Sequence, residues 1–224
     1  MTAEWGRVPA RPRCIMRVLI ADDHAIVRRG LIQILTDAWK TVTVGEARDV
    51  PEVLRLASEQ DWDIVVLDIS MPGRNGLEAL KELRQVRPRT PVLILTTHPA
   101  EQYAIRVLRA GAAGYMTKES APEHLVEAVR RVTAGGKYIS PALAELLAAS
   151  VADDSEKPPH ESLSDREYQV LCMIASGKTV GQIALELSLS DKTISTYRAR
   201  ILEKMGMKTN ADLTHYAISN RLTQ

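Results

Sequence analysis

Short apolar runs alternate with amphipathic stretches over the first part of the chain. Two of the runs, 18–20 and 64–67, contain no polar residue, which is typical of parallel strands that helices cover on both faces. The pattern predicts five strands, at 18–21, 42–47, 63–67, 92–96 and 113–116. It predicts helices between and after them, at 24–37, 50–60, 75–86, 101–110 and 121–134. This order indicates a doubly wound α/β domain whose ligand site lies at the carboxyl ends of a five-stranded parallel sheet.

The strand pattern stops after Gly135-Gly136. A short helix is expected at 141–150, and 151–162 is rich in Asp, Ser, Pro and Glu, as is typical of a linker. The pattern then predicts a small all-α domain of four helices, at 165–175, 179–187, 191–205 and 210–222. The expected division is therefore an N-terminal extension at 1–15, an α/β domain at 16–138, a linker with a short helix at 139–160 and the helical domain at 161–224.

Composition excludes several classes of protein. A net charge of +1 argues against a nucleic-acid coat protein or a polybasic membrane binder, although it leaves room for a local basic face. Cys14 and Cys172 lie far apart, so neither a disulfide scaffold nor a cysteine zinc site is indicated. No run reaches the roughly 18 apolar residues of a membrane span. We expect a cytoplasmic protein that does not enter the membrane.

Acidic and basic residues follow the predicted strands where each strand ends. Asp22 and Asp23 follow the first strand, Asp68 the third and Lys118 the fifth, and Thr96 closes the fourth. Each has a simpler interpretation alone, as a cap or a surface side chain, but parallel strands bring all of them to one edge of the sheet. Three carboxylates there would repel each other unless a cation such as Mg²⁺ lay between them. The set predicts phosphoryl transfer onto Asp68, with Lys118 and the Thr96 hydroxyl meeting the phosphate.

Residues 16–136 resemble the receiver domain of two-component response regulators. The resemblance rests on VLIADDH at 18–24, DISMPGRNG at 68–76, Thr96 and Lys118. It implies that Asp68 is the phosphoacceptor, that Asp22, Asp23 and Asp68 hold Mg²⁺ with the backbone carbonyl of Ser70, and that Met71-Pro72 and Gly76 shape the loop beside them. It also implies that Tyr115 is the switch aromatic, which turns inward when Thr96 moves; the simpler interpretation is a half-buried tyrosine at the sheet edge.

Phosphatases of the haloacid dehalogenase type also use an aspartate nucleophile. They require a second Asp two residues later, where this chain has Ser70. We therefore expect no catalytic residues and no enzymatic activity beyond slow autodephosphorylation.

The second and third helices of the C-terminal domain are joined by Ser188-Leu189-Ser190, which is the arrangement of a helix-turn-helix. On the third helix, Ile194, Ile201 and Met205 share one face, with Tyr197 flanking. The opposite side carries the candidate DNA contacts Lys192, Ser195, Thr196, Ala199 and Arg200. A basic amphipathic helix is more often a solvated face than a DNA reader, so this helix alone does not establish DNA binding.

Residues 161–224 resemble the LuxR-type domain of NarL/FixJ regulators. The resemblance rests on LSDRE at 163–167, IASGK at 174–178, IA at 183–184, KTI at 192–194 and ILEKMG at 201–206. It implies base contacts from Ser195, Thr196 and Ala199, and phosphate contacts from Lys192, Thr193 and Lys204. The family often has Lys where Ser195 lies and His where Tyr197 lies, so the DNA sequence bound by known members does not transfer; Arg198 and Arg200 are candidates to compensate.

Together the two resemblances identify a DNA-binding transcriptional response regulator of the NarL/FixJ family. Its expected partners are a sensor histidine kinase, double-stranded DNA and a second copy of the chain, at least when it is phosphorylated or DNA-bound, with RNA polymerase as a further candidate. Autoinducer-binding LuxR proteins share the C-terminal domain, but this chain has a carboxylate site in place of their signal-binding domain and contains no Phe. Two alternatives stay open: a DNA binder whose receiver is not phosphorylated, and a phosphoryl-relay protein that acts through a protein partner.

Overall fold

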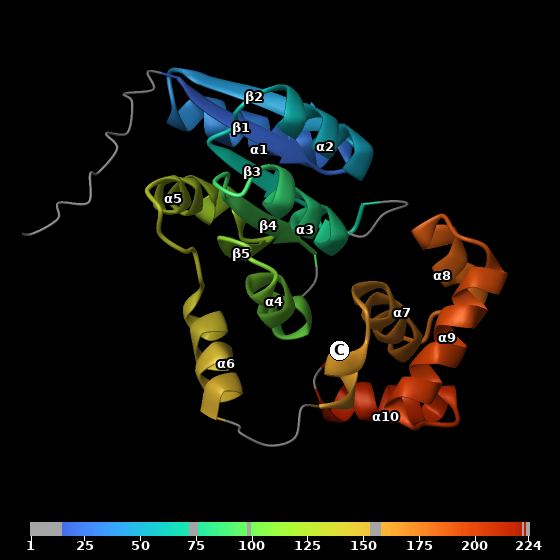
Figure 1. The fold of residues 1–224 in the computed structure, drawn as a ribbon. Coiled ribbons are helices and arrows are strands. Elements are labelled where there is room, and N and C mark those ends of the chain that lie inside the picture. Colours follow the sequence, from blue (N-terminus) through green and yellow to red (C-terminus); the bar gives the residue numbers. More distant parts are fainter. Residues whose placement is uncertain (1–14, 72–75, 98–99, 153–157, 221, 223–224) are drawn as a thin grey trace, which may run out of the picture.

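The computed structural model describes residues 15–71, 76–97, 100–152, 158–220 and 222. Residues 1–14, most of the expected N-terminal extension, lie outside this set. The first part of the chain forms a five-stranded sheet in which every neighbouring pair is parallel, in the order β2-β1-β3-β4-β5 (Figure 1). The strands are β1 (Met16–Ala21), β2 (Val42–Ala47), β3 (Ile64–Leu67), β4 (Val92–Thr96) and β5 (Gly114–Thr117). The predicted doubly wound parallel sheet is confirmed.

Helices cover both faces of this sheet. They are α1 (Ala25–Ala38), α2 (Val50–Glu59), α3 (Gly76–Val86), α4 (Ala100–Arg109) and α5 (Ala121–Thr133). Val18 and Ile20 pack into the apolar cluster beneath α1 and α5, whereas Leu19 belongs to the cluster that includes α2 and α3. This two-sided burial explains why β1 is apolar at successive positions instead of alternating. Residues Met16 and Arg17 extend β1 beyond its apolar run because they pair with Val42 and Thr43 of β2.

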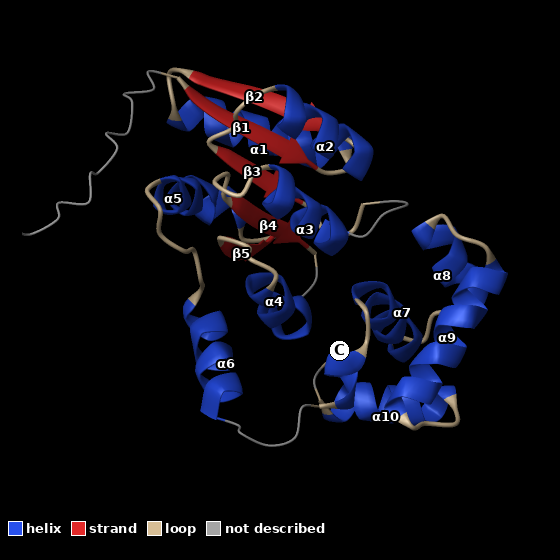
Figure 2. Cartoon of the chain, in the orientation of Figure 1, coloured by secondary structure: helices blue, strands red, loops and turns tan. Residues whose placement is uncertain are grey.

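The rest of the chain is helical (Figure 2). It comprises α6 (Pro141–Ala152), the 3-10 helix η1 (Pro159–Ser162), α7 (Asp165–Ala175), α8 (Val180–Leu187), α9 (Asp191–Met205) and α10 (Asn210–Ser219). Residues 159–162, at the end of the segment expected to be a linker, form η1. Of the same segment, 153–157 lie outside the described residues. No helix in the described parts of the chain is both long and apolar enough to cross a bilayer.

Helix α7 is the centre of the C-terminal bundle, and every residue from Arg166 to Ala175 is buried. Its first turn carries the expected capping box, in which the Ser164 hydroxyl accepts from the Glu167 amide and the Glu167 carboxylate accepts from the Ser164 amide. Helices α9 and α10 pack against it within the bundle. The apolar cluster that contains α7 also includes Tyr103 of α4, so the two parts of the chain share a continuous buried region.

Candidate functional site

The carboxyl ends of β1 and β3 bring the predicted acidic residues together. The two strands are neighbours in the sheet, and the Asp68 amide donates to the carbonyl of Ala21 at 2.8 Å. Asp22 and Asp68 are both 1% exposed, whereas the Asp23 side chain is 29% exposed. Two buried carboxylates therefore lie side by side, with a third nearer to solvent.

Lys118 provides the positive charge between the buried carboxylates. Its Nζ lies 2.7 Å from Asp68 Oδ2 and 2.7 Å from Asp22 Oδ2. The turn after β5 is fixed by the Lys118 amide, which donates to the Thr96 carbonyl at 2.8 Å. Lys118 follows β5, which lies beyond β4 in the sheet. Residues that follow β1, β3 and β5 therefore meet, as the sequence predicts.

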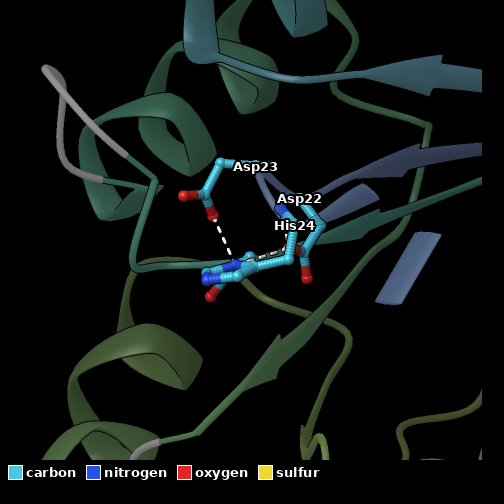
Figure 3. Close-up of side chains that lie close together, drawn as sticks. Asp22, Asp23 and His24 are labelled. Carbon is cyan, nitrogen blue, oxygen red and sulfur yellow. Dashed lines mark hydrogen bonds and ion pairs between the residues drawn. The ribbon is translucent and has the colours of Figure 1, made fainter. Parts of the chain in front are cut away.

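His24 also belongs to this cluster, although no role was predicted for its side chain. Its Nδ1 lies 2.9 Å from Asp23 Oδ1 and 3.2 Å from Asp22 Oδ1 (Figure 3). Its amide donates to Asp22 Oδ1 at 2.8 Å, which closes a tight loop between β1 and α1. The imidazole remains 63% exposed. The DDH sequence contained the signal for this contact, because a residue directly after two metal-site carboxylates lies within reach of both.

The charge balance of the site shifts two pKa values. Burial raises the pKa of the Asp68 carboxyl, and the attraction of Lys118 and a hydrogen bond from the Ser70 amide reduce this rise only in part. Burial alone would lower the pKa of Lys118, but the carboxylates of Asp68 and Asp22 outweigh burial and raise it. The lysine is thus held charged beside a carboxylate that is costly to keep ionised, and any second cation would lower that cost.

The residues present fit a hard divalent cation. One ligand atom from each of Asp22, Asp23, His24 and Asp68 lies within 4.8 Å of the others. Three of the four donors are carboxylates, which is the oxygen-rich set that Mg²⁺ prefers. The predicted fourth oxygen belongs to Ser70, whose amide donates to Asp68 Oδ1 at 2.9 Å and which therefore lies beside the carboxylate. Pro72, predicted to shape the same loop, lies outside the described residues, whereas Met71 is buried and Gly76 begins α3.

Thr96 closes β4 as predicted, and Tyr115 is the second residue of β5. Thr96 is fully buried and Tyr115 is 3% exposed. Tyr115 is therefore not the half-buried tyrosine of the simpler interpretation, because its ring packs in the buried cluster that contains Tyr103 and Tyr168. Its role as the switch aromatic stays a prediction. Any change at Thr96 would act on a tyrosine that is already packed.

The helix-turn-helix is formed by α8 and α9. Ser188 ends α8 in the left-handed conformation, with φ of 52°, and Ser190 caps α9 by accepting from the Thr193 amide at 3.1 Å. Ile194, Ile201 and Met205 are buried, as the helical wheel predicts. Six of the seven residues predicted to contact DNA are exposed and Thr193 is half-buried; the exposed ones are Lys192, Ser195, Thr196, Ala199, Arg200 and Lys204.

Two of the exposed residues, Thr196 and Lys204, have partners within the protein. The Thr196 hydroxyl donates to the Lys192 carbonyl at 2.9 Å. Lys204 Nζ donates to Glu167 Oε2 at 2.6 Å, and this bond ties α9 to the buried capping box of α7. Lys204 thus has a structural partner besides its predicted role at a DNA phosphate.

A contact between α4 and the start of the C-terminal bundle joins the two sites. Arg106 Nη1 donates to the Leu163 carbonyl at 2.8 Å, its Nη2 donates to the His160 carbonyl at 2.9 Å, and its guanidinium carbon lies 4.4 Å above the Tyr168 ring centre. Ser70, two residues after Asp68, lines a cavity of about 90 Å³ with residues of α7 that include Gln169. The C-terminal bundle therefore contacts α4 and borders the cavity that Ser70 lines, which the sequence did not reveal.

Two family profiles match this chain, and each corresponds to one of the two sites. Residues 18–130 match the response regulator receiver domain. Residues 161–217 match the bacterial regulatory proteins of the luxR family.

Full-length relatives combine the same two parts. The response regulator GacA of Pseudomonas aeruginosa is 40% identical over 205 residues, which cover 91% of this chain and 96% of the relative. The response regulator UvrY of Escherichia coli K12 is 36% identical over 209 residues, covering 93% and 96%. A structure of RcsB from Salmonella enterica serovar Typhimurium, bound to promoter rprA in the presence of phosphomimetic BeF3-, is 28% identical with a TM-score of 0.62, covering 90% of this chain and 98% of that one. This chain belongs to the NarL/FixJ family of two-component response regulators, in which a receiver domain is joined to a LuxR-type DNA-binding domain and regulates transcription.

Proposed function

We propose that Asp68 accepts a phosphoryl group from a phosphohistidine of a sensor kinase, and that this modification controls DNA binding by α8 and α9. The observation that carries the proposal is the position of Lys118, whose ammonium lies 2.7 Å from both buried carboxylates. A lysine in this position can leave the Asp68 carboxylate and form an ion pair with the oxygens of the phosphoryl group that Asp68 then carries. The receiver family and the oxygen-rich cluster of Asp22, Asp23 and Asp68 support Mg²⁺ as the cofactor.

The proposed transfer is a simple displacement. A carboxylate oxygen of Asp68 forms a bond to phosphorus while the phosphorus–nitrogen bond of the donor breaks, and the electron pair returns to the histidine nitrogen. Mg²⁺ would neutralise the phosphoryl oxygens, a charge role it plays in phosphoryl transfer generally. Lys118 forms an ion pair with the phosphoryl group, and the Thr96 hydroxyl donates a hydrogen bond to one of its oxygens. Asp68 is an acceptor in this scheme, so the chain is a substrate of the kinase and shows at most slow loss of its own phosphate.

The phosphate would act on the DNA-binding domain through α4. The phosphoryl group carries close to two negative charges, and since the Asp68 carboxylate loses its own charge on modification, the site beside the ends of β4 and β5 gains about one negative charge in total. Tyr115 on β5 shares a buried cluster with Tyr103 of α4, and Tyr103 packs against Tyr168 of α7. A change of a few kcal/mol in the free-energy difference between the inactive and active conformations is enough for regulation, since a nearly complete switch takes about 5.5 kcal/mol.

The predicted DNA contacts on α9 are largely exposed while α4 and α7 are in contact. This observation favours dimerisation on paired half-sites over uncovering of the recognition helix as the consequence of phosphorylation. In the RcsB structure that this chain resembles, RcsB is bound to a promoter in the presence of a phosphomimetic. A second copy of the chain and double-stranded DNA are therefore the proposed partners, in the cytoplasm of a bacterium, while a contact with RNA polymerase stays a prediction.

Phosphorylation is tested by incubating the protein with acetyl phosphate and Mg²⁺ and measuring the acyl phosphate by mass spectrometry. Asp68→Asn should abolish labelling, whereas Asp37→Asn, which changes an exposed aspartate of α1, should leave it unchanged. Persistent labelling of Asp68→Asn would assign the acceptor to another residue. An unlabelled wild-type protein that still binds DNA would support the alternative of a DNA binder with an unmodified receiver.

DNA binding is tested by genome-wide footprinting of the full chain with and without the acyl-phosphate donor. Sites that appear or strengthen with the donor are expected. A protein that is labelled but shows no salt-dependent affinity even for random DNA would support the phosphoryl-relay alternative.

A further inference from the structure

Arg28 is a buried arginine in the first turns of α1, and its side chain is 9% exposed. Arginine is seldom buried without a partner. Helical side chains lean toward the N-terminus of their helix, and this direction brings the guanidinium back over the loop that contains Asp22 and Asp23. There Nη1 donates to the backbone carbonyl of Asp22 at 2.8 Å and Nε donates to Glu46 Oε2 at 3.0 Å.

Glu46 anchors the other side of this arginine. It lies near the end of β2, where it is paired with Ile20 of β1. The Arg28–Glu46 ion pair therefore joins α1 to the strand next to the acidic loop. The negative charge of Glu46 also offsets that of the guanidinium, so Arg28 brings hydrogen-bond donors close to the carboxylates with little net positive charge.

The carbonyl that Arg28 holds lies just beyond the strand ladder. The Asp22 amide still donates to the Ala47 carbonyl at 3.1 Å, at the last step between β1 and β2. The Asp22 carbonyl belongs to the same planar peptide unit as the Asp23 amide, because the peptide bond does not rotate freely. Fixing this oxygen therefore fixes the plane from which the Asp23 side chain starts.

Asp23 depends on its backbone more than Asp22 does. The Asp22 carboxylate is 1% exposed and is held by Lys118 and by the His24 amide. The Asp23 carboxylate is 29% exposed and is met by the imidazole of His24, which is itself 63% exposed. We propose that Arg28 is a positioning residue of the divalent-cation site, which holds the Asp22 carbonyl and so directs the Asp23 carboxylate toward the cation.

This inference rests on the proposed function. It predicts that removal of Arg28 changes the Mg²⁺ affinity in the direction opposite to that expected from charge alone. A cation close to a magnesium site should weaken binding, so its removal should strengthen binding if charge alone mattered. If Arg28 acts by positioning, its removal should weaken binding instead. The sign of the change in Mg²⁺ affinity therefore separates the two roles.

The test measures the Mg²⁺ dissociation constant of the full chain by calorimetry, and the rate of labelling by acetyl phosphate over a range of Mg²⁺ concentrations. Arg28→Met keeps an unbranched apolar stem and removes the guanidinium with its donors. We expect its Mg²⁺ affinity to fall about tenfold, as for other groups that orient metal ligands, while the labelling rate at saturating Mg²⁺ stays close to that of the wild type. Arg29→Met, which changes the exposed neighbour on the same helix, should alter neither value.

Arg28→Lys gives a second test that does not depend on charge. Lysine keeps the positive charge but lacks the planar fork that serves the Asp22 carbonyl and Glu46 together. We expect its Mg²⁺ affinity to fall by about threefold, the value of a weak hydrogen bond. Circular dichroism and urea unfolding identify which variants are folded.

Unchanged or tighter Mg²⁺ binding in a folded Arg28 variant would overturn the role of Arg28 and leave the proposed function intact, provided that the wild type is labelled. A wild type that neither binds Mg²⁺ nor accepts the phosphoryl group would contradict the proposed function, and the role of Arg28 with it. A lower labelling rate that saturating Mg²⁺ does not restore would also count against positioning, because it would indicate general damage to the site.

Discussion

The ring of Tyr103 on α4 stands edge-on to the ring of Tyr168 on α7, with centroids 5.3 Å apart and planes at 89°. Both tyrosines are 2% exposed, so each domain buries an aromatic side chain of the other. Edge-to-face pairs of this kind contribute about 0.5–1.5 kcal/mol beyond the burial of their area. The pair joins α4 to α7, and the contacts around it determine how firmly the two domains are joined.

Arg106→Ala should loosen this interdomain contact. The guanidinium, 19% exposed, bonds two backbone carbonyls at the start of the C-terminal bundle, lies 3.2 Å from Asp165 and stacks on Tyr168. Loss of these bonds should cost the docked arrangement about 2–4 kcal/mol. Small-angle scattering should show a larger radius of gyration, and amide exchange in α7 should become faster.

Arg109→Ala is the matched comparison for Arg106. Arg109 also belongs to α4 and also crosses to the other domain, where its guanidinium lies 2.7 Å from Glu161, but its side chain is 58% exposed. An exposed pair of this kind contributes at most about 1 kcal/mol. Equal expansion of both variants, or none in Arg106→Ala, would contradict the assignment of the contact to Arg106.

Lys118→Met should destabilise the protein chiefly when Mg²⁺ is absent. The lysine side chain is 11% exposed and lies between Asp22 and Asp68, so its removal leaves two buried carboxylates without a counter-charge. Breaking a buried pair costs about 3–5 kcal/mol. Urea unfolding in EDTA should show this loss, and Mg²⁺ should recover a larger part of the stability in the variant than in the wild type. An equal effect of Mg²⁺ on both proteins would mean that the cation does not neutralise the same carboxylates as Lys118.

Gly76→Ala should disturb the loop beside Asp68. A Cβ at this position would lie 2.5 Å from the Asp68 carbonyl oxygen and 2.5 Å from the Ile69 Cα. Both are backbone atoms, so the loop itself must shift, at a cost of about 1–3 kcal/mol. Urea unfolding should show the loss of stability, and labelling by acetyl phosphate should be slower. Gly30→Ala is the control, because a Cβ at that helical glycine has no atom within 4 Å.

Periodicity and strand ends predicted most of the first domain. The convergence of Asp22, Asp68 and Lys118 follows from strand direction alone, since each residue ends a parallel strand. The role of Arg28 could not be predicted in this way, because its partner Glu46 is 18 residues away and the contact depends on which strand lies beside β1. The same reason hid the contact between Tyr103 and Tyr168: both have the spacing of core residues, and no local pattern shows that they pack against another domain.

The C-terminal domain was predicted well where local signals exist. The capping box at Ser164 and Glu167 and the buried face of α9 are properties of single helices and were confirmed. The sequence suggested a linker up to Ser162 because Pro and Ser are common there, whereas η1 forms where the His160 carbonyl and Glu161 meet α4. Tertiary contacts thus ordered a segment whose composition alone favours a coil.

Arg200→Ala should weaken DNA binding without changing phosphorylation. Arg200 is exposed on α9, beside Thr196 and Ala199. If it contacts a DNA phosphate, its removal should reduce the slope of log affinity against log salt by about 0.9. Fluorescence anisotropy with a fixed duplex at several salt concentrations measures this slope. Lys178→Ala is the control, because Lys178 is paired with Glu186 and is not among the predicted DNA contacts; an equal change in both variants would show only a general effect of charge.

Acidification should weaken the folded state through His160. Burial and the nearby charge of Arg106 lower the pKa of this histidine, and Glu161 opposes the shift only in part. Its Nδ1 lies 2.7 Å from the hydroxyl of Tyr216. Because the folded state binds this proton less readily than the unfolded chain, stability should be fully present above the unfolded pKa of about 6.5 and should fall as the pH drops from there toward the folded value.

The measurement is the free energy of unfolding of the full chain in urea between about pH 7.5 and about pH 5, the range in which histidine titrates. His160→Gln should flatten this part of the profile, since glutamine does not titrate. His215→Gln, which changes an exposed histidine of α10, should leave the profile as in the wild type. A slope that persists in His160→Gln would assign the proton uptake to another group; the carboxyl of Asp68 would not explain it, because a pKa that burial raises makes the folded state more stable on acidification.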